Sequence, residues 1–214
     1  MKGYRIQLIR HGITNANLTG AYIGTTDEPL APEGVAELYK KIEEKQYPLV
    51  QKVYTSPLKR CVSTASILYP NTFTVGVEDL KELDFGDFEG KLAVDLMETP
   101  EYKEFLKGGL DNPAPNGESL RALIDRCYTA ISWIIQDMMK EGMTNCAIVT
   151  HGGIIMNLLS CFGMPKMSPM EFPSDFGEGY ELLVTADMWM RSHAFEILGK
   201  FPYLPNEQED SEQE

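Results

Sequence analysis

The chain has 214 residues, of which 43% are hydrophobic, so it can bury a substantial core within one domain. Its formal net charge of -13 argues against a surface that binds nucleic acid or an anionic membrane. No apolar run approaches the ~20 residues of a membrane span, and Arg10 and His11 follow the start of the chain too soon for a signal peptide, so we expect a cytoplasmic protein.

Short apolar runs alternate with helical patterns in the first half of the chain. The expected strands are 4–10, 50–55 and, more weakly, 73–77. Pro32 opens a helix that runs to about Lys45, and Ser56 caps another helix with Pro57 at its first position. Residues 13–31 and 82–90 carry no helical period and are expected to be loops.

The second half continues the alternation after an interruption. The expected helices are 92–98, 100–107, a long one from Asn116 or Ser119 to near Gly142, and 152–162. The expected strands are 146–150 and an antiparallel hairpin of 180–187 and 192–198. Together they predict an α/β fold of three layers, with a mostly parallel sheet between helices. We expect one domain over 1–206, a lid-like segment over 92–115 and a disordered acidic tail over 207–214.

Two of the three histidines follow an apolar strand and precede a glycine. These are His11 and His151. His193 has no residues suited to binding an anion beside it in the sequence and is interpreted as structural. In an open α/β sheet, ligands bind outside the carboxyl ends of the strands. The two histidines could therefore meet across one crevice.

Groups suited to binding an anion surround His11. Arg10 precedes it, and a buried arginine is costly unless an anion or carboxylate pairs with it. Thr14 and Asn17 follow within two turns and supply neutral donors. Arg60, one of only six arginines, lies in the first turn of the helix after Ser56, and the N-terminus of a helix attracts phosphate. The guanidinium group of an arginine can bind a phosphate through two parallel hydrogen bonds.

Six motifs follow one another along the chain. They are Arg10-His11-Gly12-x-Thr14 with Asn17, Gly24-x-x-Asp27-x-x-Leu30-x-x-x-Gly34, Ser56-x-Leu58-x-Arg60-x-x-x-Thr64-Ala65, Glu82-x-x-Phe85-Gly86-x-Phe88-Glu89-Gly90, Pro115-x-Gly117-Glu118-Ser119 and Thr150-His151-Gly152-Gly153. In type and order these motifs resemble those of the histidine phosphatase superfamily, whose fold is that of phosphoglycerate mutase. They cover residues 4 to about 160. The chain departs from the family at Ile13, where an acidic residue is common, and at Phe88, which replaces a tryptophan.

The resemblance implies a role for each matching residue. His11 would be the nucleophile that forms a phosphohistidine, and Arg10, Arg60 and His151 would hold the phosphoryl oxygens. The donors that complete the phosphate site would be Thr14, Asn17 and the backbone N–H groups of Ile23, Gly24 and Gly152. Spacing alone does not choose a proton donor among Glu82, Asp84, Asp87 and Glu89, but the resemblance selects Glu82.

The resemblance leaves three functions to distinguish. Residues 91–115 contain no arginine and no tryptophan, which favours a phosphatase, of the α-ribazole phosphatase type or of low specificity, over a phosphoglycerate mutase. A non-catalytic phosphate-binding module would need a broken catalytic residue. We expect a small phosphorylated metabolite as the partner, no cofactor and no metal, with a homodimer left open. The four cysteines form no Cys-x-x-Cys pair and are interpreted as buried, reduced thiols.

Overall fold

Seven strands form one sheet in the computed structural model, which describes residues 2–205. In the spatial order β3-β2-β4-β1-β6-β7-β5, every strand is parallel to β1 except β6. The strands are β1 Gly3–Arg10, β2 Val53–Thr55, β3 Thr74–Gly76, β4 Asn145–Thr150, β5 Gly163–Met164, β6 Gly179–Thr185 and β7 Phe195–Phe201. The expected α/β class with a mostly parallel sheet is confirmed.

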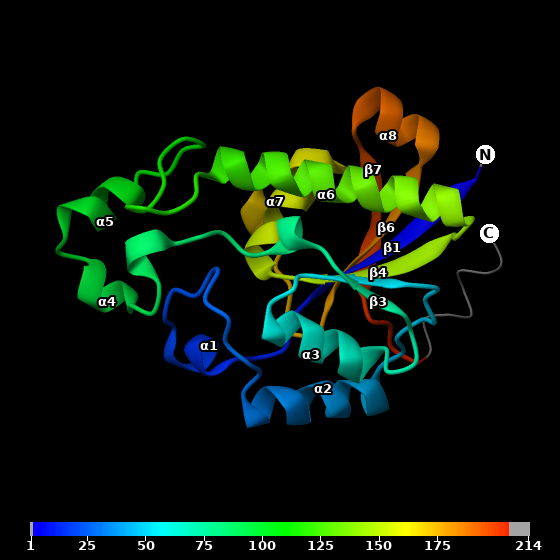
Figure 1. Ribbon diagram of the computed structural model, residues 1–214, viewed down its shortest axis with the longest axis horizontal. Coiled ribbons are helices and arrows are strands. Elements are labelled where there is room, and N and C mark those ends of the chain that lie inside the picture. Colours follow the sequence, from blue (N-terminus) through cyan, green and yellow to red (C-terminus); the bar gives the residue numbers. More distant parts are fainter. Residues whose placement is uncertain (1, 206–214) are drawn as a thin grey trace.

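Helices cover both faces of this sheet. They are α1 Asn15–Thr19, α2 Pro32–Glu44, α3 Lys59–Leu68, α4 Ala93–Leu96, α5 Pro100–Phe105, α6 Leu120–Glu141, α7 Gly152–Phe162 and α8 Ala186–Ser192, with short 3-10 turns at Glu78–Leu80, Gly86–Phe88 and Pro169–Glu171. Figure 1 shows α2 and α3 on one face and α6 and α7 on the other. The short helices α1, α4 and α5 lie beyond the carboxyl ends of the central strands (Figure 1).

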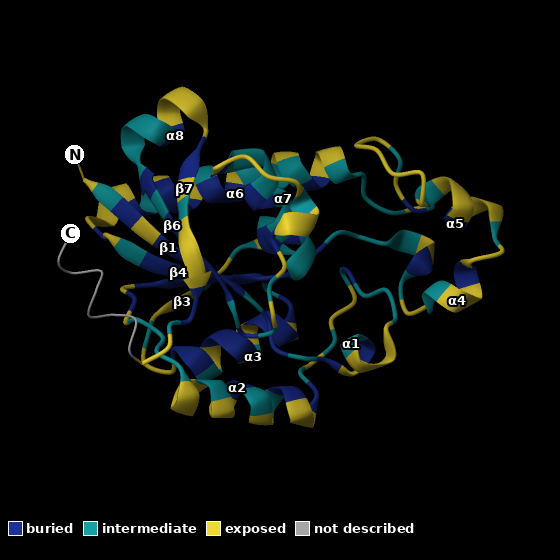
Figure 2. Cartoon of the chain, turned by 180° about the vertical axis from the view of Figure 1, so that it is seen from behind, coloured by how far each residue is buried: buried dark blue, intermediate teal, exposed yellow. Residues whose placement is uncertain are grey.

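The alternation of side chains along the central strands divides the core in two. Ile6 and Leu8 of β1 pack in the larger cluster with the inner sides of α6 and α7. Ile9, which points to the opposite face, packs in a second cluster with Leu38 of α2 and Cys61 of α3. Figure 2 shows the result, with buried residues along the central strands and exposed residues on the outer sides of the helices and along much of β7.

The register of β1 and β4 brings the two histidines together. Arg10 is paired with Thr150, the last residues of two neighbouring parallel strands. The backbone N–H of His11 donates to the Thr150 carbonyl oxygen at 2.9 Å. His11 and His151 therefore leave the sheet side by side, although 139 residues separate them in sequence.

Several expected boundaries in the first half are wrong. The expected loop 13–31 contains α1, because the Thr14 side chain caps this helix and Asn17 completes a capping box. Helix α3 begins at Lys59 rather than Pro57, and the Ser56 hydroxyl accepts from Leu58 N and contacts His151 instead of capping it. Strand β2 is shorter than 50–55, because its pairing with β3 and β4 begins at Val53.

The second half shows further differences. The expected helices 92–98 and 100–107 shrink to α4 and α5, and β5 was not expected. The two C-terminal strands are antiparallel neighbours, but α8 joins them in place of a short hairpin connection, because Thr185 caps a helix there. The long helix α6 starts after its cap Ser119 and ends at Gly142, and α7 has the expected bounds. The expected tail 207–214 lies outside the described residues.

The cysteines fit the interpretation from the sequence. Cys61, Cys127 and Cys146 are buried free thiols, and Cys161 is a partly buried one. Among residues 2–205, no helix is both long and apolar enough to cross a membrane.

Candidate active site

The imidazole of His11 offers one unprotonated nitrogen. Its Nδ1 lies 2.6 Å from the Gly12 carbonyl oxygen, which can only accept, so Nδ1 carries the proton and Nε2 keeps its lone pair. Burial, with the nearby charges of Arg60 and Arg10, lowers the pKa of His11 to about 3. The ring is therefore neutral at any ordinary pH, as a nitrogen nucleophile must be.

Arg10 is held against the wall of the site with its buried Nε unpaired. Its Nη1 donates to the Ser174 carbonyl oxygen at 2.8 Å, and its guanidinium lies 3.8 Å from the ring centre of Phe176. Its Nε is buried and has no hydrogen-bond partner. A Cβ on Gly152 would lie 3.2 Å from this Nε, so the glycine leaves room beside it. A buried unsatisfied donor of this kind indicates a place for an acceptor ligand.

Arg60 and His151 lie deeper, behind His11. Arg60 is 1% exposed and His151 is 0% exposed. Arg60 Nε donates to His151 Nδ1 at 3.3 Å, which leaves the proton on Nε2, and that atom donates to Ser56 Oγ at 2.9 Å. Burial, followed by the charges of neighbouring groups, holds the pKa of His151 well below its usual range. The rings of His11 and His151 meet edge to face with centres 5.2 Å apart.

Glu82 is the carboxyl group that reaches this cluster. Its two oxygens accept from Leu83 N and Gly153 N, each at 2.9 Å. Burial raises its pKa, although these two hydrogen bonds oppose the shift. A Cβ on Gly153 would lie 2.5 Å from Glu82 Oε1, so only glycine permits this close approach. Glu82 is thus a candidate to hold a proton and to release it during a reaction.

These groups open onto a cavity of about 420 Å³. Its lining residues are Arg10, His11, Asn17, Ile23, Glu82, Phe85, Gly152, Gly153, Met156, Pro173, Ser174 and Asp175. Arg60 and His151 stand behind this lining. Segment 92–115 contributes no lining residue among those described, so its action as a lid stays a prediction.

The other expected phosphate-binding residues divide into two groups. Asn17 and Ile23 line the cavity. Thr14 is buried and hydrogen-bonded to Asn17, and the Gly24 N–H donates to Glu89 Oε1 at 2.9 Å. Thr14 and Gly24 therefore position this side of the cavity in the structure without facing it.

Glu89 is a positioning residue whose role the sequence did not reveal. Its carboxylate accepts from the backbone N–H groups of Gly24, Thr25, Thr26 and Phe85 and from the Thr26 hydroxyl. The same loop gives its Gly24 and Thr26 carbonyl oxygens to Arg60. Glu89 therefore joins the loop that holds Arg60 to the loop that carries Glu82.

An ion pair between Arg126 of α6 and Glu118 supports the segment that carries Glu82. Arg126 binds Glu118 through two hydrogen bonds of 2.7 and 2.8 Å and donates to the carbonyl oxygens of Asp79, Lys81 and Glu82. Glu118 belongs to one of the six sequence motifs. The role of Arg126 could not be predicted from the sequence, because it depends on contacts between distant segments.

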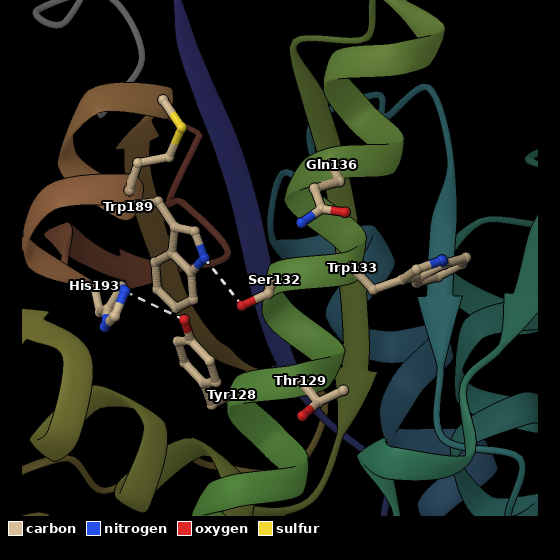
Figure 3. A pocket seen from close by; sticks show the side chains of 8 residues that line it. Tyr128, Thr129, Ser132, Trp133, Gln136, Trp189 and His193 are labelled. Carbon is tan, nitrogen blue, oxygen red and sulfur yellow. Dashed lines mark hydrogen bonds between the residues drawn. The ribbon is translucent and has the colours of Figure 1, made fainter.

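A second hollow, of about 500 Å³, lies between α6 and α8 (Figure 3). It holds His193, which caps the end of α8 at a φ of 46° rather than lying in a strand as expected. The Tyr128 hydroxyl lies 3.2 Å from His193 Nε2, and Trp189 Nε1 donates to Ser132. None of its lining residues is an arginine, a lysine or an acid. Among its described lining residues, this hollow therefore has no arginine or lysine to hold a phosphate charge.

The comparisons with known proteins agree with this geometry. The model of the histidine phosphatase superfamily (branch 1) matches residues 6–190. Phosphoglycerate mutase-like protein 4 of Arabidopsis thaliana is 35% identical over 72% of this chain and 68% of its own, and the uncharacterized phosphatase PhoE of Bacillus subtilis is 34% identical over 72% and 74%. The crystal structure of the alpha-ribazole phosphatase from Shigella flexneri superposes with a TM-score of 0.74 at 26% identity, over 85% of this chain and 91% of that one.

Proposed function

Because the chain belongs to branch 1 of the histidine phosphatase superfamily, we propose that it hydrolyses small phosphomonoesters through a phosphohistidine at His11. The observation that carries this proposal is the unprotonated Nε2 of a buried histidine, set among two arginines and a second histidine. The cytoplasmic location expected from the sequence stays a prediction.

The first step transfers the phosphoryl group to His11. Nε2 attacks phosphorus in line with the ester oxygen, so a P–N bond forms while the P–O bond to the alcohol breaks. Glu82 gives its proton to the departing alkoxide, and its raised pKa favours the protonated form that this step needs. In the second step the Glu82 carboxylate takes a proton from water, which attacks phosphorus and breaks the P–N bond. Phosphate leaves, and both His11 and Glu82 return to their starting forms.

The cations stabilise the charge on the three non-bridging oxygens. Arg10 has an unpartnered Nε available for this task, and the buried Arg60 supplies a second guanidinium charge near His11. A bound phosphate dianion favours the charged form of His151, whose pKa is depressed in its absence. Groups fixed in advance within a buried site stabilise developing charge without having to reorganise.

An assay with an aryl phosphate tests the proposal. Hydrolysis should persist with a chelator and should fall by about 10⁴-fold or more in His11→Ala, because the covalent step is lost. Brief incubation with a ³²P-labelled ester should label the wild type with a phosphate that acid removes and base does not. Full activity of His11→Ala would overturn the proposal, and phosphate binding without any hydrolysis by the wild type would favour the non-catalytic module.

A phosphoglycerate mutase is the second candidate, favoured by the 35% identical mutase-like relative. A mutase must also hold the second anionic group of its substrate, yet Arg10 is the only cationic side chain among the described lining residues. Supplying 3-phosphoglycerate with 2,3-bisphosphoglycerate separates the two. The phosphatase should release inorganic phosphate, whereas 2-phosphoglycerate as the main product would establish the mutase.

A further inference from the structure

The segment 173–178 forms a wall of the cavity that no motif of the sequence identified. Backbone and side-chain bonds fix it to the end of β1. Arg10 N donates to the Glu178 carbonyl oxygen, Gly177 N donates to the Arg10 carbonyl oxygen, and Arg10 Nη1 donates to Ser174. The Tyr180 hydroxyl donates to the Pro173 carbonyl oxygen at 2.8 Å. The wall therefore has a set position relative to His11 before any ligand binds.

Asp175 is the charged side chain that this wall presents to the cavity. It is exposed, it lines the cavity, and its charge acts on Arg10. Within residues 2–205 its carboxylate has no hydrogen-bond or ion-pair partner. In contrast, Glu178 in the same segment is bound by Lys41 and Lys45. The Asp175 carboxylate is thus free to meet the part of a substrate that lies beyond the phosphate.

The remaining lining sharpens this charge pattern. A phosphate at His11 uses Arg10, the one cationic lining residue, and is also within the charge field of Arg60. Beyond that point the described lining offers the apolar side chains Ile23, Phe85, Met156 and Pro173, together with Ser174 and the exposed carboxylate of Asp175. A second anion there would meet like charge and apolar surface, with no cation to receive it.

We propose that the site selects phosphomonoesters whose alcohol part is apolar and carries no anion, and that Asp175 favours a positive charge on that part. This inference rests on the proposed function and names its substrate class. Asp175 acts here as a specificity-determining residue, because it touches the alcohol part and not the reacting atoms. Its contribution is the same in the ground state and the transition state, so it changes KM or Ki and not kcat.

Three esters of similar size and different charge test the inference as competitors of aryl phosphate hydrolysis. They are phosphocholine, its uncharged isostere 3,3-dimethylbutyl phosphate, and 4-phosphooxybutanoate. In the wild type, Ki should rise in that order, and the cationic ester should bind at least about fivefold more tightly than the anionic one. Asp175→Asn should narrow this difference about fivefold, because the cationic ester loses an attraction and the anionic ester loses a repulsion.

Asp187→Asn is the control for the change in net charge, because it removes one carboxylate of α8, which is paired with Arg191 and lines no part of the cavity. Asp187→Asn should leave the ratios between the Ki values of the three esters unchanged. The Ki of inorganic phosphate, measured in each variant, shows whether the substitution changes binding of the phosphate group itself. Equal Ki values for the three esters, or unchanged ratios in Asp175→Asn, would overturn the inference while aryl phosphate hydrolysis upholds the proposed function. Loss of that hydrolysis in the wild type would overturn both.

Discussion

The cavity at His11 and the hollow between α6 and α8 both hold a histidine beside aromatic rings, but they differ in the charge and the hydrogen bonding of their polar groups. At His11, two arginines and a buried carboxyl group converge, and Arg10 Nε has no partner. Between α6 and α8, Tyr128 pairs with His193 and Trp189 pairs with Ser132 (Figure 3). We therefore propose the chemistry in the smaller of the two hollows, because its polar groups are buried and partly unsatisfied.

The largest effect that the comparison predicts, apart from loss of the nucleophile, is that of Glu82→Gln. Alkyl esters need a proton on the leaving oxygen, so their kcat should fall by ~10²–10⁴-fold. An aryl ester with a good leaving group, such as nitrophenyl phosphate, should lose far less in the phosphorylation step. Burst kinetics and a leaving-group series measure this difference, and equal losses for both ester types would assign the acid to another residue.

The same variant has a signature in pH. Burial raises the pKa of Glu82 above its usual 4.5, so the proton that the alkoxide needs is retained to a higher pH than an ordinary glutamate allows. Turnover of alkyl esters should therefore decline as pH rises through this raised pKa. Glu82→Gln should lack that decline, because glutamine does not titrate. A decline that persists unchanged in the variant would belong to a different group.

Arg60→Ala should have the next largest effect, a loss of ~10²–10³-fold in kcat/KM. Its guanidinium also holds the Gly24 and Thr26 carbonyl oxygens, so Arg60→Lys should recover only part of the activity, since an ammonium group lacks the planar fork. Arg121→Ala, which removes an exposed arginine paired with Asp111, is the control and should retain full kcat/KM. Wild-type activity in Arg60→Ala, measured on folded protein, would exclude Arg60 from the phosphate site.

Glu89→Gln should reduce kcat/KM by about tenfold, because the loop that holds Arg60 would shift while the reacting groups remain. Glutamine keeps one acceptor oxygen but loses the charge that five donors share. Asp87→Asn changes an exposed carboxylate of the same loop and should leave kcat/KM unchanged. Inorganic phosphate should bind more weakly to Glu89→Gln than to the wild type. If the variant loses stability but keeps the wild-type affinity for phosphate, Glu89 has a structural role only.

Local rules of sequence explain which parts of this comparison could be predicted. Ser119 and Gly142 mark the ends of α6 by cap chemistry, and the strand–histidine–glycine pattern located His11 and His151. Helix α8 was missed although Thr185 caps it, because the local sequence does not show that Trp189 is buried and bonded to Ser132 of α6. The roles of Glu89 and Asp175 depend on which loops the fold brings together, and neither residue differs locally from the other acids of an acidic chain.

His193→Asn should have the smallest effect, and it tests whether the two hollows are independent. His193 has a φ of 46°, a left-handed conformation that asparagine adopts more readily than most residues. The variant loses the contact with the Tyr128 hydroxyl, so these opposing changes should leave the free energy of unfolding within about 1 kcal/mol of wild type by urea denaturation. Activity should be unchanged, because no lining residue is common to the two hollows. A change in kcat/KM of more than about threefold would instead mean that the two hollows are coupled. The route would be α6, whose Arg126 donates to the Glu82 carbonyl oxygen.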